Sequence, residues 1–102
     1  MYEHILIVGS GTDYSKEKIK KNADDSDYII AADGALNILD ELKIVPDLIL
    51  GDMDSINIKL LDRYGDIKKQ TFPRDKDYSD SELAIKEAQR LEAKRISLAA
   101  VT

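Results

Sequence analysis

Three short, uninterrupted apolar runs constrain the fold of this 102-residue chain more than any other feature. They are Ile5–Val8, Tyr28–Ala32 and Leu48–Leu50. Each is continuous rather than alternating, which is typical of a β-strand that is buried on both faces of a parallel sheet. A turn signal follows each run. Because parallel strands need long crossover connections, we expect helices between them.

The segments between the runs carry helical patterns. Ser15–Asn22 is a polar stretch that predicts a weak helix with little to bury. The next helix is predicted from apolar residues at i, i+3, i+4 and i+7, and a shorter one is predicted over Asn57–Tyr64. The last helix has a start signal, because Ser79-Asp80-Ser81-Glu82 fits a capping box with Ser79 as N-cap. The residues of these apolar stripes are Ile19 and Ala23; Ala35, Ile38, Leu39 and Leu42; Leu60, Leu61 and Tyr64; and Ala84, Ala88 and Leu91.

Two further strands complete the predicted fold. Ile67–Thr71 is more polar than the other strands and is expected near an edge, and Ile96–Val101 is expected to be a fifth, buried strand. Strands that alternate with helices over short connections predict the α/β class: a doubly wound, mostly parallel sheet of about five strands with flanking helices. We expect residues 1–102 to form one domain, with His4 before the first strand at the edge opposite the strands' carboxyl ends.

Composition excludes several classes of function. With 20 acidic and 15 basic residues, the net charge of −5 argues against a nucleic-acid-binding surface, which needs a basic stripe. The chain has no cysteine, which excludes disulfides, zinc–thiolate sites and thiol catalysis. The N-terminus has no basic region, and its apolar run is too short for a signal peptide or a membrane span. We therefore expect a soluble, cytoplasmic protein that does not act at a membrane.

Two clusters of aspartates are the strongest functional signal. Asp52 and Asp54 follow the third strand, and the segment Asp75–Asp80 follows the fourth. The carboxyl ends of parallel strands share one edge of a sheet, and converging carboxylates are usually held together by Mg²⁺ that carries a nucleotide's phosphates. For Asp52 and Asp54, the alternative is a solvated loop in which Ser55 or Asp54 caps the next helix. For Asp80, the alternative is that its carboxylate only interacts favourably with the dipole of its helix.

Two glycine turns leave alternatives open. Gly9-x-Gly11 resembles part of a dinucleotide fingerprint, but Tyr14 occupies the third glycine position, so a tight turn is the alternative to phosphate contact. Asp33-Gly34 is either a turn with Gly34 at positive φ or a close approach to phosphate or ribose, with Asp33 as hydrogen-bond acceptor.

Arg74 and Lys76 are the basic residues nearest the second aspartate cluster. A guanidinium fork and an ammonium point charge both suit phosphate oxygens, and ordinary surface charge is the alternative. The sequence contains no Gly-x-x-x-x-Gly-Lys-[Ser/Thr] motif, so a P-loop is not expected.

Three blocks of this sequence resemble thiamine pyrophosphokinase in letters, order and spacing. They are Ala32–Ala35, Pro46–Ser55 and Asp75–Ala84. The resemblance implies transfer of a pyrophosphoryl group from ATP to the hydroxyl of thiamine, which yields AMP and thiamine diphosphate. It also implies that residues 1–102 are the α/β catalytic domain, incomplete at its C-terminal end, without the small β-sandwich that follows it in the family.

The resemblance also implies roles for individual residues. Mg²⁺ is expected on Asp52, Asp54 and Asp80, and these three residues and Asp77 are the expected catalytic residues. The expected nucleotide-binding residues are Asp33, Gly34, Asp52, Ser55, Lys76 and Asp77, of which Lys76 and Asp77 lie at the phosphates and the reacting hydroxyl. The full-length family enzyme forms a homodimer with thiamine bound across the interface.

Three other functions are alternatives to this one. A fragment could bind Mg²⁺ and nucleotide without turnover, and another heterocyclic alcohol, such as a hydroxymethylpterin, could replace thiamine. An NAD-binding protein is disfavoured by Tyr14 and leaves Asp52 and Asp54 unexplained. Because family members continue beyond the fifth strand, we expect either a piece of a longer protein or a nucleotide-binding remnant.

Overall fold

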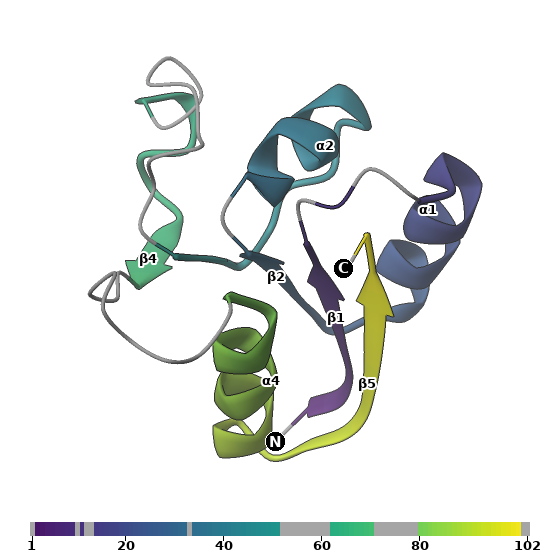
Figure 1. Ribbon diagram of the computed structural model, residues 1–102, viewed down its shortest axis with the longest axis vertical. Coiled ribbons are helices and arrows are strands. Elements are labelled where there is room, and N and C mark those ends of the chain that lie inside the picture. Colours follow the sequence, from purple (N-terminus) through teal and green to yellow (C-terminus); the bar gives the residue numbers. More distant parts are fainter. Residues whose placement is uncertain are drawn as a thin grey trace.

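The structure is a computed structural model that describes residues 2–9, 11, 14–32, 34–51, 62–70 and 80–100, with the backbone alone at 80 and 81. Figure 1 shows a twisted sheet with helices on both of its faces. The order of elements along the chain is β1 (Tyr2–Val8), α1 (Lys16–Asp25), β2 (Tyr28–Ala32), α2 (Ala35–Glu41), β3 (Leu48–Leu50), β4 (Lys68–Gln70), α4 (Asp80–Arg90) and β5 (Ala93–Ala99).

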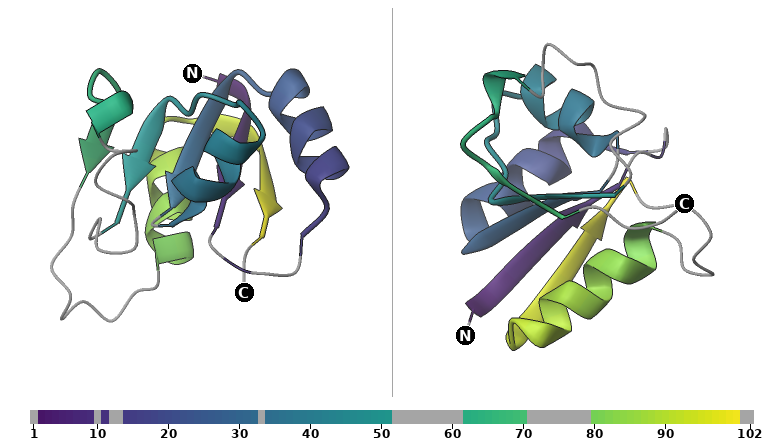
Figure 2. Two further views of the ribbon diagram at one scale, coloured as in Figure 1. Left: turned by 90° about the horizontal axis from the view of Figure 1, so that it is seen from above. Right: turned by 90° about the vertical axis from the view of Figure 1, so that its left-hand side faces the viewer.

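The sheet has the strand order β4-β3-β2-β1-β5, and every pairing is parallel. The chain therefore moves outward from β1 to β4 and then returns to lie on the other side of β1. In the right-hand view of Figure 2, α1 and α2 cover one face of the sheet and α4 covers the other. This is the predicted doubly wound α/β arrangement. It puts the topological switch point between β1 and β5.

A core lies on each face of the sheet. On the α4 side, nine buried residues form one cluster: Ile5, Ile7, Ile30, Ala32, Leu48, Leu50, Leu83, Ala84 and Ala88. The cluster on the other face combines residues of the sheet with Ile19 of α1 and Ala35 and Leu39 of α2. Residues of β1 alternate between the two cores, which explains why its apolar run is continuous.

The prediction of elements is confirmed for most of the described chain. β2 and β3 have the predicted bounds, and β4 lies at an edge of the sheet, as its polar sequence indicated. The weak first helix exists and begins after Ser15, whose hydroxyl accepts a hydrogen bond from the Lys18 N–H. Most of the helix expected over Asn57–Tyr64 lies outside the described residues, which include its last part from 62 onward.

The bounds of the fifth strand were wrong. It was expected over Ile96–Val101, but β5 begins at Ala93 and ends at Ala99. Ala100 already has a φ of 53°, which is not strand geometry. The strand is partly exposed at an edge, so Lys94 and Arg95 can pair with β1 through their backbones while their side chains reach solvent.

The expected place of His4 was also wrong, because it lies within β1 rather than before it. Its side chain is only 2% exposed. Its Nε2 atom lies 2.6 Å from the Ser97 hydroxyl on β5, and its Nδ1 atom lies 3.4 Å from a carboxylate oxygen of Asp25 at the end of α1. The histidine therefore links three elements at the edge opposite the strands' carboxyl ends, which agrees with a structural role.

A buried carboxylate connects α4 to β4. Glu87 is 8% exposed and accepts two hydrogen bonds from Arg90, at 2.8 and 2.6 Å, and a longer one from Gln70. The hydrogen bonds from Arg90 lower the pKa of Glu87, although burial acts in the opposite direction. This interaction therefore adds stability above the ordinary carboxyl pKa of 4.5, and the contribution is lost as the pH falls through the lower folded-state pKa.

We expect Glu87→Gln to lower the melting temperature at pH 7 by on the order of 5 °C, because the ion pair is lost. Thermal unfolding followed by circular dichroism at pH 7 and at a pH below the lowered pKa of Glu87 tests this, because the carboxyl loses its charge as the pH falls through that pKa. The difference between variant and wild type should shrink at the lower pH. An equal difference at both pH values would show that the charge of Glu87 is not what stabilises this contact.

Candidate functional site

The carboxyl ends of the parallel strands and the first turns of α4 lie at one edge of the sheet. Ala32 of β2 is the register partner of Leu50 at the end of β3. Leu83 and Ala84, in the first turns of α4, belong to the same buried cluster as these two residues. In Figure 2 the start of α4 lies at the edge where β1 and β5 end. The described ends of the segments that carry the candidate residues therefore come together.

The structure describes only part of the predicted site. Asp33, Asp52, Asp54, Ser55, Lys76 and Asp77 lie outside the described residues. Gly34 and the backbone of Asp80 are described. Asp80 is the first residue of α4, as the capping-box prediction required. Asp33 directly follows Ala32, the last residue of β2. Asp52 directly follows Gly51, which comes after Leu50, the last residue of β3. The described neighbours of both aspartates therefore lie at this edge.

Gly34 does not have the positive φ that a turn interpretation required. Its φ is −70° and its ψ is 1°, and it occupies the N-cap position of α2. Its carbonyl oxygen accepts a hydrogen bond of 3.0 Å from the Asn37 N–H. The positive-φ interpretation was therefore wrong, and the first turn of α2 begins directly at the predicted nucleotide site.

The backbone N–H groups of the first glycine pair both bond to the end of β5. The N–H of Gly9 donates to the Ala99 carbonyl over 2.8 Å, and that of Gly11 donates to the Ala100 carbonyl over 2.7 Å. These two N–H groups therefore join the ends of β1 and β5, and neither is left to donate to a phosphate. This geometry argues against phosphate contact through the glycine N–H groups.

Gly51 has the unusual backbone at this edge. Its φ is 134°, in a region that residues with a Cβ rarely adopt. Its N–H donates to the Gln70 carbonyl over 3.0 Å, which extends the β3–β4 ladder by one residue beyond Leu50. The residue is buried and directly precedes the first aspartate cluster.

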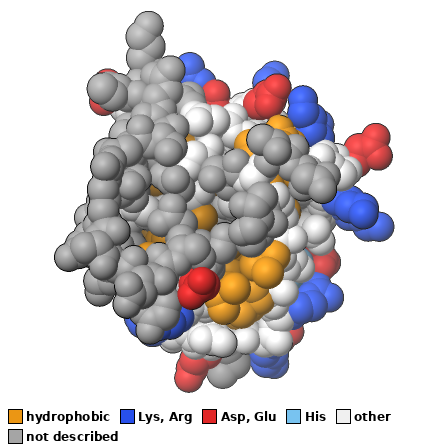
Figure 3. Space-filling view, in the orientation of Figure 1, with side chains coloured by type: hydrophobic (Ala, Val, Ile, Leu, Met, Phe, Trp, Pro, Cys, Tyr) orange, Lys and Arg blue, Asp and Glu red, His pale blue; other side chains and the backbone are white. Residues whose placement is uncertain are grey.

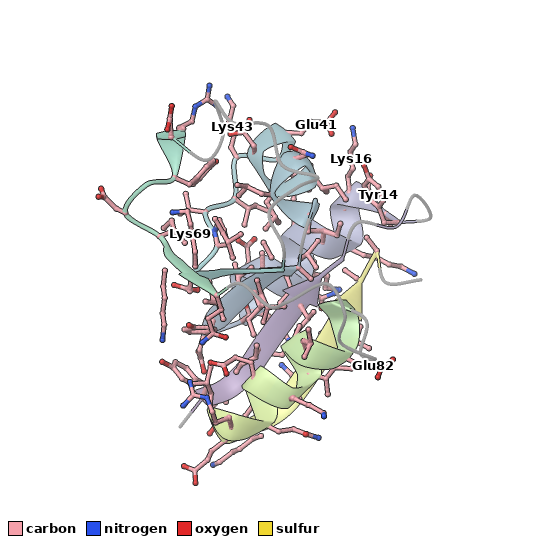
Figure 4. The ribbon with its side chains drawn as sticks, turned by 60° about the vertical axis from the view of Figure 1, so that its left-hand side comes forward. Tyr14, Lys16, Glu41, Lys43, Lys69 and Glu82 are labelled. Atoms are coloured by element: carbon pink, nitrogen blue, oxygen red, sulfur yellow. The ribbon has the colours of Figure 1, made fainter. Side chains whose placement is uncertain are left out.

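Polar contacts fix the segment that leads into β4. Arg63 and Tyr64 each bond to the same carboxylate oxygen of Asp40 on α2, both over 2.9 Å. Burial and the Asp40 hydrogen bond raise the pKa of Tyr64. Lys69, labelled in Figure 4, donates to the carbonyls of Tyr64 and Ile67 over 2.9 and 3.0 Å. The bonds to Asp40 hold Arg63 and Tyr64 against α2, and those from Lys69 join β4 to the turn that precedes it.

A hollow of about 370 Å³ lies beside the switch point, between α1 and the end of β5. Polar groups of Tyr14, Lys18 and Asn22 line it, with Leu98 among its apolar residues. Figure 4 labels Tyr14 near the start of α1, beside Lys16, whose ammonium lies 3.3 Å from Glu41 of α2. No motif in the sequence predicted this hollow. The i, i+4 spacing of Lys18 and Asn22 was the available signal.

Charges and apolar groups are unevenly exposed. Among the described residues, Val45 and Leu98 are the large hydrophobic side chains that are exposed, at 58% and 49%. Figure 3 shows apolar atoms at the surface between α4 and β5.

No three acidic, histidine or cysteine side chains within the described part of the chain are grouped so that they could hold a metal ion. The aspartates expected to bind Mg²⁺ through their side chains lie outside this part: Asp52 and Asp54 are not described, and Asp80 is described by its backbone alone.

Comparison with known proteins decides the family. The family model described as "Thiamin pyrophosphokinase, catalytic domain" matches residues 19–102. This chain belongs to that family. The match includes the segments that contain all of the predicted site residues. No curated protein matches the chain.

Solved structures of thiamin pyrophosphokinases share the fold. The yeast enzyme is 25% identical with a TM-score of 0.67, and the match covers 86% of this chain and 31% of that one. The Geobacillus thermodenitrificans enzyme is 25% identical with a TM-score of 0.75, with 93% and 45% covered. The Bacillus subtilis enzyme, at 21% identity, supports the fold alone, with a TM-score of 0.76 and coverage of 98% and 48%.

This thiamin pyrophosphokinase-type chain thus spans between about a third and a half of the length of the structures it matches. Its family supports a kinase-type function. None of the helices in the described ranges could cross a bilayer; the longest, α4, has 11 residues, whereas a span needs about 20.

Proposed function

We propose that this chain is the α/β catalytic part of an enzyme that transfers a pyrophosphoryl group from ATP to the hydroxyl of thiamine. One observation carries the proposal. The family match extends over both aspartate clusters, and the described ends of β2, β3 and α4 that adjoin the candidate residues lie at one edge of the sheet. Ligands of open α/β sheets bind at this edge.

The proposed metal is Mg²⁺, held by Asp52, Asp54 and Asp80. The donor set fits the ion, because Mg²⁺ prefers carboxylate oxygens and completes its octahedron with water and phosphate oxygens. When bound, the ion neutralises charge that develops on the transferring group. The chain has no cysteine and its one histidine is at the opposite edge, so the proposed chemistry depends on positioning and charge neutralisation.

The proposed reaction breaks one bond of ATP and forms one new bond. The thiamine hydroxyl oxygen attacks the β-phosphorus, the bond from that phosphorus to the oxygen bridging the α-phosphate breaks, and AMP leaves. The hydroxyl proton is lost during the transfer, and Asp77 is the residue we assign beside that hydroxyl. Lys76 is assigned to the phosphates, and Asp33, Gly34 and Ser55 to the nucleotide. The products are AMP and thiamine diphosphate.

Thiamine is proposed to bind across two copies of the full-length protein, as the family resemblance implies. A second candidate is a binding module, in which these 102 residues bind Mg²⁺ and ATP without turnover. A pyrophosphokinase for another hydroxymethyl heterocycle is a third candidate.

Product identification distinguishes these candidates. The chain is incubated with ATP and Mg²⁺, together with either thiamine or a hydroxymethylpterin, and products are separated by liquid chromatography with mass detection. We expect equal amounts of AMP and thiamine diphosphate and no pterin diphosphate. ADP with thiamine monophosphate would contradict pyrophosphoryl transfer. ATP binding without any AMP would favour the binding module.

A further inference from the structure

We propose that Gly51 is a positioning residue for the acidic segment that follows it, because its positive φ sets the direction in which the chain leaves β3. This inference rests on the proposed Mg²⁺–ATP function and adds a residue to it. Gly51 combines a φ of 134°, a hydrogen bond to β4 and a buried position at the carboxyl edge.

Two constraints meet at this residue. The hydrogen bond of 3.0 Å from the Gly51 N–H to the Gln70 carbonyl keeps it on the β3–β4 ladder. Its φ, however, is far from the values near −120° of a parallel strand, so the chain turns at the same residue that still pairs. A residue with a Cβ can easily donate this hydrogen bond from a strand-like backbone. It cannot do so at this φ without strain, because this φ region is essentially restricted to glycine.

An alanine at this position has two ways to respond. It can keep the backbone and accept the strain, or it can rotate to a negative φ and change the course of the chain immediately before Asp52. The second response is easier here, because β3 and β4 have only three residues each and β4 lies at the edge of the sheet. We therefore expect the substitution mainly to weaken Mg²⁺-dependent ATP binding through the aspartates. The loss of folding stability should be smaller.

Three synthetic variants test the proposal: Gly51→Ala, the same position with D-alanine, and Gly65→Ala. The chain is short enough for total chemical synthesis. D-alanine adds the same methyl group, but its extended backbone region lies at positive φ, the mirror image of that of L-alanine. Gly65 is the matched control, because it lies in a turn, its φ is not positive, and an added Cβ would meet only the Asp62 carbonyl at 3.3 Å.

The measured quantity is the ratio of ATP affinities with and without Mg²⁺, at a temperature where circular dichroism shows every variant folded. L-alanine at position 51 should reduce this ratio about tenfold or more, whereas D-alanine and Gly65→Ala should stay near the wild-type ratio. A general loss of stability would not change the ratio. If L-alanine prevents folding, D-alanine must still fold and bind as the wild type does.

The outcomes separate this inference from the function on which it rests. A wild-type chain whose ATP affinity does not depend on Mg²⁺ would reject the proposed function itself. A wild-type ratio in the L-alanine variant would reject the role of Gly51 and leave the function standing. The same rejection follows if D-alanine lowers the ratio as much as L-alanine does, because the methyl group rather than the φ angle would then be responsible.

Discussion

Asp54→Asn is expected to weaken Mg²⁺-dependent ATP binding by about 10- to 100-fold, the equivalent of losing one strong charge-assisted contact. The amide keeps the size of the side chain but removes a negative charge that would bind the cation. The fold should be unchanged or slightly more stable, because closely spaced carboxylates repel one another in the absence of metal. Calorimetric titration of ATP in the presence of Mg²⁺ measures the affinity, and thermal unfolding measures the stability.

Asp24→Asn is the charge-matched control for this experiment. Asp24 is exposed near the end of α1, so it lies at the opposite edge from the strands' carboxyl ends. Both substitutions remove one of the 20 acidic residues and change the formal net charge from −5 to −4. Equal affinities in Asp54→Asn, Asp24→Asn and the wild type would remove Asp54 from the metal site.

Ile7→Ala is expected to lower the free energy of unfolding by about 2–5 kcal/mol. Ile7 is fully buried in β1, the strand that pairs with both β2 and β5, and its side chain belongs to the cluster on the α4 side. Small domains have a free energy of unfolding of only about 5–15 kcal/mol, so this one substitution removes a large part of it. Urea unfolding followed by circular dichroism measures the effect.

The control is Val45→Ala, at a side chain that is 58% exposed. Substitutions at such positions usually change stability by no more than about 0.5 kcal/mol. A similar loss in both variants would mean that Ile7 does not lie in the core that the structure describes.

Strands buried on both faces could be predicted from the sequence with accurate bounds. β2 and β3 are continuous apolar runs because both of their faces meet a core, so burial alone marks where they begin and end. The starts of β1 and β5 could not be located in this way. Tyr2 pairs with Ala93, and His4 pairs with Arg95, through a parallel register between segments about 90 residues apart. Their side chains are polar or partly exposed, so no local pattern reveals the pairing.

The same distinction applies to the candidate site. The position of Asp80 at the start of α4 followed from a local capping pattern, and the structure confirms it. The φ of Gly34 could not be predicted, because an Asp-Gly pair suits both a positive-φ turn and a helix N-cap. The hydrogen bonds that tie Gly9 and Gly11 to the end of β5 depend on strand order, which no local motif specifies.

The most direct test of the proposed site is a calorimetric titration of ATP into residues 1–102, first without and then with Mg²⁺. If the aspartates at the carboxyl ends of β3 and β4 form a Mg²⁺–nucleotide site, ATP should bind at least about tenfold more tightly when Mg²⁺ is present. An ATP affinity that is the same with and without Mg²⁺ would contradict the proposed site.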